Sequence, residues 1–164
     1  MKTNYCECLL WGALLLAGCS DDNPGVAEEE DPGEHACEHA GEAGAALEAA
    51  ADPADAVELV LGEEPVTVTF PAEGAGYHGY VRLRGPADAL LFAGAEAVIS
   101  SLTSADGGRE LLPEAAPNEL CPDAIPEHFD LELEDAEYLL ELGPATVDSV
   151  WLMLLDASGH AHSS

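Results

Sequence analysis

Positive charge is what this chain has least of. Its 164 residues include 4 Lys and Arg against 33 Asp and Glu, and the formal net charge is −29 at pH 7. Such a surface repels nucleic acid and anionic lipid headgroups, so we expect no nucleic-acid partner. The acidic residues are spread along the whole chain, which favours adaptation to a salty medium over a local attraction of cations.

Lysine and the common catalytic motifs are also missing. Lys2 is the only lysine, so the rest of the chain has no group for Schiff-base chemistry or a lysine-dependent phosphate loop. The sequence has no Gly-x-Ser-x-Gly elbow, no His-Glu-x-x-His helix and no glycine-rich phosphate loop. We therefore expect a non-enzymatic protein without catalytic residues.

The first 18 residues form a short basic and apolar segment. Lys2 lies near the start, residues 9–17 are apolar, and the segment closes with Leu16-Ala17-Gly18-Cys19. A basic start, an apolar run and small residues before a cut are typical of a secretory signal. The apolar run is too short for the roughly 20 residues that span a bilayer.

The end of this segment resembles the bacterial lipobox. The resemblance implies cleavage before Cys19 and lipidation of its thiol. Ser20 follows Cys19 where an aspartate would imply retention in the inner membrane, so the resemblance implies an anchor in the outer membrane of the cell envelope. Several acyl chains hold a protein on a membrane without a transmembrane helix. We therefore expect the protein to be attached to the membrane through its lipid alone.

Residues 19–34 are predicted to be a lipidated cysteine and an acidic linker. Residues 20–34 hold seven Asp and Glu, with two prolines and two glycines, and almost nothing to bury. Such a stretch cannot offset the entropy of becoming ordered, so we expect a disordered, solvated tether.

Two cysteines remain beyond the signal and the lipidated position. Cys37 and Cys121 would lie in an oxidising compartment, where two thiols most often pair. Their disulfide would close a loop of about 84 residues, and the chain-entropy model gives such a loop roughly 4 to 5 kcal/mol. The alternative is that one or both cysteines are metal ligands.

The rest of the chain predicts an all-β domain over residues 35–158, followed by a flexible tail at 159–164. Residues 45–51 favour a short helix by their alanine content. Many short strands with Gly, Pro and Asp between them favour an antiparallel β-sandwich or jelly-roll-like fold. His78, Tyr80, Arg82 and Arg84 would share one face of a strand over 77–84. The predicted strands cover residues 57–61, 66–70, 77–84, 89–92, 96–102, 129–133, 138–142 and 147–155.

Two resemblances accompany this pattern. Residues 129–154 resemble the closing strands of β-sandwich modules related to the bacterial pre-peptidase C-terminal domain. Most of the chain after the signal resembles lipoproteins of the myxobacterial (deltaproteobacterial) type, through Cys19, the Cys37-Glu38-His39 stretch, His78-Gly79-Tyr80 and Cys121. The resemblances imply a secreted, lipid-anchored β-sandwich and supply no activity.

One cluster of residues could hold a transition metal. His35, Cys37 and His39 lie at i, i+2 and i+4, so an extended backbone would place them on one face. His78 or Cys121 would complete a closed tetrahedral site for zinc or copper. The alternative is a Cys37–Cys121 disulfide with exposed histidines beside it, in a structural or protein-interaction module. That disulfide would still leave His35, His39 and His78 as a three-nitrogen site.

The remaining histidines and two large side chains of the last predicted strand have simpler interpretations. His128 is expected on a solvated strand face together with Asp130 and Glu132. His160 and His162 fall in the tail, where a frayed terminus is expected. Trp151 and Met153 share a face of the last strand and are predicted to be core residues.

Overall fold

The computed structural model describes residues 31–157, apart from residues 61, 63, 75, 86, 106–109 and 135–136. The predicted signal, Cys19, most of the predicted linker and the tail with His160 and His162 lie outside the described residues. Among the helices of the described part, none is long and apolar enough to cross a membrane.

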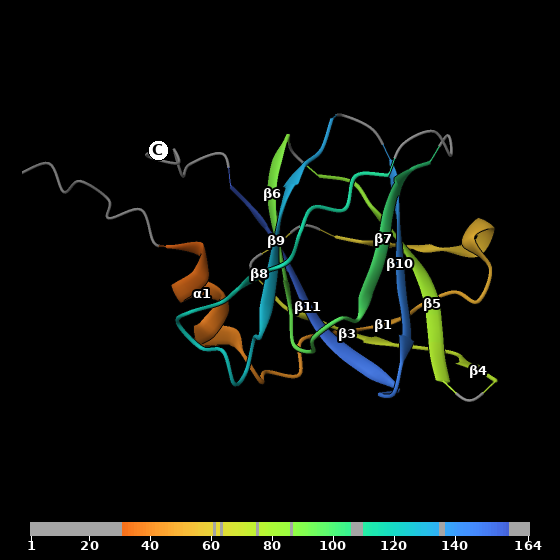
Figure 1. The fold of residues 1–164 in the computed structure, drawn as a ribbon, viewed down its shortest axis with the longest axis horizontal. Helices are drawn as coiled ribbons and strands as arrows, with labels where there is room; N and C mark the ends of the chain where they lie inside the picture. The colour runs from red at the N-terminus through yellow and green to blue at the C-terminus, as the bar shows by residue number, and fades with distance from the viewer. Residues whose placement is uncertain are drawn as a thin grey trace, which may run out of the picture.

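The described chain forms two β-sheets that pack face to face (Figure 1). The first sheet has the strand order β1-β3-β11-β6-β9-β8. Its strands are β1 Ala45–Glu48, β3 Val66–Thr69, β11 Ser149–Asp156, β6 Asp88–Ala93, β9 Glu127–Glu132 and β8 Ala116–Pro117. The long strand β11 lies between β3 and β6 and is antiparallel to both.

The second sheet has the strand order β2-β5-β10-β7, and β4 pairs with β5 beside it. Its strands are β2 Val57–Leu59, β5 Gly76–Leu83, β10 Tyr138–Ala145, β7 Ile99–Ser104 and β4 Ala72–Glu73. β10 lies antiparallel between β5 and β7, so the side chains of these three strands share rows across the sheet.

Alternating side chains of both sheets fill the space between them. On β5 the inward residues Gly79, Val81 and Leu83 are buried, while the outward residues between them are half-buried. The main hydrophobic core also includes Leu140 and Leu152, which lie in the middle of the two sheets. This period of two is what a sheet with one buried face produces. The predicted all-β sandwich is confirmed.

The strictly antiparallel arrangement is wrong, because each sheet holds one parallel pair. β1 runs parallel to β3, and β2 runs parallel to β5. Between β1 and β2 the chain crosses to the second sheet, where Ala50 and Tyr80 exchange two backbone hydrogen bonds of 2.8 and 3.0 Å. A short 3-10 helix, η1 (Pro53–Asp55), completes the crossing.

The helix predicted over residues 45–51 is wrong. Residues 45–48 form β1, and Leu47 packs against the main core. Alanine propensity is a weak preference of a few tenths of a kcal/mol per residue. A parallel ladder to β3 and the burial of Leu47 outweigh it.

Residues 35–39 are helical. The extended backbone on which the predicted metal cluster depends is therefore wrong. Helix α1 spans Pro32–His39, so it begins inside the predicted linker. The Asp31 side chain accepts hydrogen bonds from the backbone N–H groups of Gly33 and Glu34 at 2.7 and 3.3 Å. Asp followed by Pro is a favoured N-cap and first helical residue, because the capping oxygen satisfies free N–H groups and Pro needs none.

A second, smaller hydrophobic cluster lies on the outer face of the first sheet, beneath α1. Ala36 of α1 is fully buried there, together with Phe92 and Met153. The prediction of a core residue is confirmed for Met153, whereas Trp151 is half-buried and packs against the edge of this cluster. His128 stacks on Phe92 with ring centroids 5.6 Å apart and is half-buried. α1 therefore covers the part of this face that holds Phe92 and Met153.

The predicted strands otherwise match the structure. Each of the eight predicted ranges coincides with β2, β3, β5, β6, β7, β9, β10 or β11, with ends displaced by a few residues. Residues 113–126 hold only the two residues of β8 as strand.

Gly143 is the glycine that β10 requires. The register between β10 and β5 shifts between Leu142 and Ala145, and Gly143 has a φ of 94° at that shift. A Cβ at this position would also collide with the backbone carbonyl oxygen of Tyr77. Gly143→Ala should therefore lower the free energy of unfolding by roughly 2 to 4 kcal/mol, measured by urea denaturation.

Gly41→Ala is the matched control for this substitution. Gly41 has a similar φ of 87°, but a Cβ there would meet nothing within 4 Å. We expect a loss of about 1 kcal/mol from backbone strain alone. Equal losses for the two variants would contradict the role of the close approach to Tyr77.

Candidate functional site

Cys37 of α1 and Cys121 form a disulfide, as the cysteine count predicted. Asn118 lies beside it and is 4% exposed. Its side-chain Nδ2 donates to both sulfur atoms, at 3.6 and 3.5 Å, and its Oδ1 accepts from the Leu120 N–H. The disulfide fastens α1 to the loop that precedes β9.

The residues predicted to bind a metal lie on opposite sides of the sandwich. His35 and His39 lie one turn apart on α1, with ring centroids 4.7 Å apart, and His39 Nδ1 is 2.8 Å from a carboxylate oxygen of Glu42. His78 is an outward residue of β5 in the second sheet, and β5 lies far from α1 (Figure 1). The structure brings together His35 with His39 and Cys37 with Cys121, but it does not bring His78 to either pair.

The described residues do not fit the predicted zinc or copper site. The Cys37 sulfur is bonded to Cys121, so it is no longer a thiolate that could ligate a metal. Among the residues whose placement the structure gives, no group of three or more His, Cys, Asp or Glu side chains is arranged to hold a metal ion.

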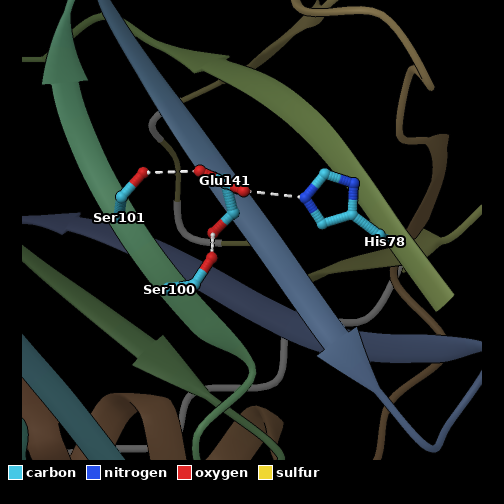
Figure 2. A network of polar contacts seen from close by, with 4 residues as sticks. All are labelled: His78, Ser100, Ser101 and Glu141. Atoms are coloured by element: carbon cyan, nitrogen blue, oxygen red, sulfur yellow. Dashed lines mark hydrogen bonds and ion pairs between the residues drawn. The ribbon is translucent and has the colours of Figure 1, made fainter. Parts of the chain in front are cut away.

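His78 instead belongs to a polar network on the outer face of the second sheet (Figure 2). Its Nε2 donates to Glu141 Oε1 at 2.8 Å, since an ionised carboxylate only accepts. Ser101 Oγ donates to the other carboxylate oxygen at 2.9 Å, and Ser100 Oγ donates to the Glu141 backbone carbonyl at 3.2 Å. Both carboxylate oxygens of Glu141 are therefore engaged from neighbouring strands.

The sheet register builds this network. Glu141 lies in the middle of β10, opposite Tyr80 on β5 and Ser101 on β7. A register shift places Ser100 as an extra residue between the partners of Glu141 and Leu142. Such a bulge turns the strand locally, and it brings two consecutive serine side chains to the same glutamate.

The environment of Glu141 stabilises its charge. The hydrogen bond from His78 lowers the pKa of Glu141 below its usual value of 4.5, with partial burial opposing this and the Ser101 hydrogen bond adding to it. The order of contacts is serine, carboxylate, imidazole. A nucleophilic triad needs the imidazole between the other two so that it can take the hydroxyl proton. The network holds side chains in place rather than activating a serine.

A second polar group lies along the same face. Arg82 Nη2 donates to the Ala54 carbonyl of η1 at 2.9 Å, and its Nε lies 3.7 Å from Glu137. Arg84 Nη2 lies 3.5 Å from the other oxygen of Glu137. These two arginines carry all the Lys and Arg charge of the residues that the structure describes.

Two cavities open on this face. The arginine cavity has a volume of about 320 Å³ and is lined by Arg82, Thr103 and Glu137 among others. The histidine cavity has a volume of about 580 Å³ and is lined by His78, Glu141 and residues that follow Gly143. They lie toward opposite ends of β5 and β10, because Arg82 and His78 are near opposite ends of β5.

We name the outer face of β5, β10 and β7 the polar face. Its outward side chains are all half-buried, and none is closed off from solvent. The predicted common face of His78, Tyr80 and Arg82 is confirmed. Glu141, Ser100 and Ser101 were missed. The polar face consists of His78, Tyr80, Arg82, Ser101, Thr103, Leu139 and Glu141.

Removal of the disulfide should destabilise the domain. The bond closes a loop with a sequence separation of 84, and a loop of that size is worth about 4 kcal/mol in the chain-entropy model. The double variant Cys37→Ser with Cys121→Ser should lose roughly 2 to 5 kcal/mol in urea denaturation. A loss below about 1 kcal/mol would show that the bond does not constrain the unfolded chain.

Loss of the Glu141 charge should change the pH dependence of stability. A carboxyl whose folded-state pKa is lowered stabilises the fold above its unfolded pKa, and this contribution disappears as the pH falls through the folded pKa. We expect Glu141→Gln to be less stable than the parent by about 1 kcal/mol or less at pH 7, since the side chain is 35% exposed. The difference in unfolding free energy should shrink at pH values below 4.5.

Glu132→Gln is the control for that experiment. It removes one negative charge from an exposed position on β9. Its unfolding free energy should follow that of the parent across the same pH range. A constant difference between Glu141→Gln and the parent from neutral to acid pH would contradict the assigned role of the Glu141 carboxylate.

Comparisons with known proteins do not place the chain in a family. No protein-family model matches it, and no curated protein matches it either.

Proposed function

We propose that this chain is a lipid-anchored, non-enzymatic protein of the bacterial cell envelope that acts as an interaction module. The lipobox-like segment ending at Cys19 supplies the anchor, and the β-sandwich supplies the binding surface. The observation that carries the proposal is the Cys37–Cys121 disulfide. Such bonds persist in oxidising compartments, which agrees with export by the signal-like residues 1–18.

The disulfide also suits a tethered domain. The 12 positions from Cys19 to Asp31 can span at most about 40 Å when fully extended. Any pull from the anchor would enter the domain at α1. Because Cys37 is bonded to Cys121, the disulfide gives that pull a path to the loop before β9 in addition to the path along the chain to the edge strand β1.

The orientation of the domain follows from the same contacts. α1 lies over the outer face of the first sheet, so the tether arrives on that side. The polar face lies on the other side of the sandwich (Figure 1). In this proposal the polar face is directed away from the anchor and meets the partner. Zinc or copper binding is left out, because Cys37 is oxidised and His78 lies apart from His35 and His39.

The proposal is tested by expressing the full chain in a Gram-negative host and measuring its intact mass and its detergent partitioning. The parent should be cleaved before Cys19, carry the mass of its acyl chains and fractionate with the outer membrane. Cys19→Ser should lose the acyl mass and partition into the aqueous phase.

Cys8→Ser is the matched control, since it removes a cysteine from the signal-like segment without touching the lipobox. It should be lipidated like the parent. Parent protein that is recovered uncleaved, or cleaved without acyl mass, would contradict the proposal.

A further inference from the structure

The polar face offers hydrogen-bond donors and acceptors at both of its ends. Arg82 and Thr103 supply donors in the arginine cavity, and Glu137 supplies acceptor oxygens there. His78 and Glu141 line the histidine cavity. Arg82 and His78 are four residues apart on β5, so the two cavities are separated by about 13 Å along the strand. A single extended ligand could reach both.

Charge selects the kind of ligand. The chain as a whole has a formal net charge of −29, so a polyanion would be repelled before it reached the face. Glu141 already accepts from His78 and Ser101, and Glu137 is paired with Arg82 and Arg84. Both carboxylates are therefore poorly placed to bind a cation as well. A neutral ligand whose own groups both donate and accept meets neither obstacle.

The polar face also carries aromatic and apolar side chains. Tyr80 lies between the two cavities, with its ring edge-on to His78 at a centroid distance of 4.9 Å and an interplanar angle of 89°. Tyr80 shares its row with Glu141 and Ser101, while Leu139 lies one row away, between Arg82 and Thr103, and lines the arginine cavity. Small-molecule sites typically combine apolar and aromatic surface with a few fixed polar groups. Tyr80 and Leu139 supply the aromatic and apolar surface, and the side chains of the cavities supply the fixed polar groups.

We propose that the polar face is a binding site for a neutral oligosaccharide. Hydroxyl groups of successive sugar rings would bond to Arg82, Thr103 and Glu137 at one end and to the His78–Glu141 pair at the other. The C–H faces of the rings would pack on Tyr80, which lies beside Glu141, and on Leu139, which lies beside Arg82 and Thr103. The hydrogen bonds of Ser101 and His78 fix the Glu141 carboxylate in advance, which lowers the entropy cost of binding.

This inference goes beyond the proposed function and is tested separately from it. The full chain carrying Cys19→Ser is used, so the outcome does not depend on lipidation. The probes are maltohexaose, cellohexaose, laminarihexaose and mannohexaose, titrated in a calorimeter. At least one should bind with a Kd between about 10 μM and about 1 mM. Absence of binding to all four at about 5 mM would overturn the proposal.

Two substitutions locate the site. Tyr80→Ala removes the ring, and Thr103→Val removes a hydroxyl from the arginine cavity while keeping its shape. Each should weaken binding about 5- to 50-fold. Thr103→Val keeps the test decisive if Tyr80→Ala does not fold, which urea denaturation would reveal. Glu132→Gln, on the outer face of the first sheet, should bind like the parent. Unchanged affinity in Thr103→Val would place the ligand elsewhere and overturn the proposal.

The salt dependence of the affinity and the binding of charged ligands decide whether the site prefers a neutral ligand. Affinity for the hexasaccharide should change less than about 2-fold between about 20 mM and about 500 mM NaCl, because the neutral ligand carries no charge that salt could screen from the protein. A steep loss of affinity with salt would contradict the proposal. So would tighter binding of oligogalacturonate, an acidic oligosaccharide, or of Ca²⁺ added alone.

Discussion

The bond between Cys37 and Cys121 is the constraint on which the arrangement of this molecule depends. α1 has eight residues, too few for a helix that is stable in water by itself. The disulfide and the buried Ala36 hold it against the outer face of the first sheet, over Phe92 and Met153. That part of the face is consequently covered, while Asp130 and Glu132 of β9 stay exposed beside it. The outer face of β5, β10 and β7 is left as the polar surface of the sandwich, and the two sides acquire different roles.

The polar face depends in turn on the central strand β10. Its inward residues Leu140 and Leu142 are fully buried in the core, which fixes the register of β10 against both neighbours. A slip by one residue would turn Glu141 inward and Leu140 outward. Burial on one side of the strand therefore determines where Glu141 lies on the other, between His78 and Ser101.

Local patterns in the sequence predicted the strands and the burial of their faces. The alternation around Val81 separated the two faces of β5 correctly, whereas Trp151 and Met153 of the last strand face the smaller cluster beneath α1 and not the space between the sheets. The cysteine count gave the disulfide. The Asp31-Pro32 helix start was present in the sequence, but the acidic composition around it favoured a linker. The alanines at 45–48 favoured a helix, and only pairing with β3, a contact distant in sequence, makes them a strand.

Local sequence patterns could not predict the candidate site either, because it also depends on contacts between residues distant in sequence. His78 and Glu141 are 63 positions apart, and their hydrogen bond exists because β5 and β10 are neighbours in the sheet. A lone charged residue in the apolar run around Leu140 marks an outward position, but it does not name its partners. The predicted metal cluster failed to assemble because the stretch at 35–39 is helical and lies on the other side of the sandwich from His78.

The central claim is that the disulfide holds α1 on the sandwich independently of the polar face. Amide hydrogen exchange of the oxidised and reduced protein measures this most directly. We predict that reduction brings the amides of α1 close to the exchange rates of an unfolded chain, while those of β5 and β10 stay protected well above that level. Protection of α1 that survives reduction to the same degree as that of β5 and β10 would contradict the account.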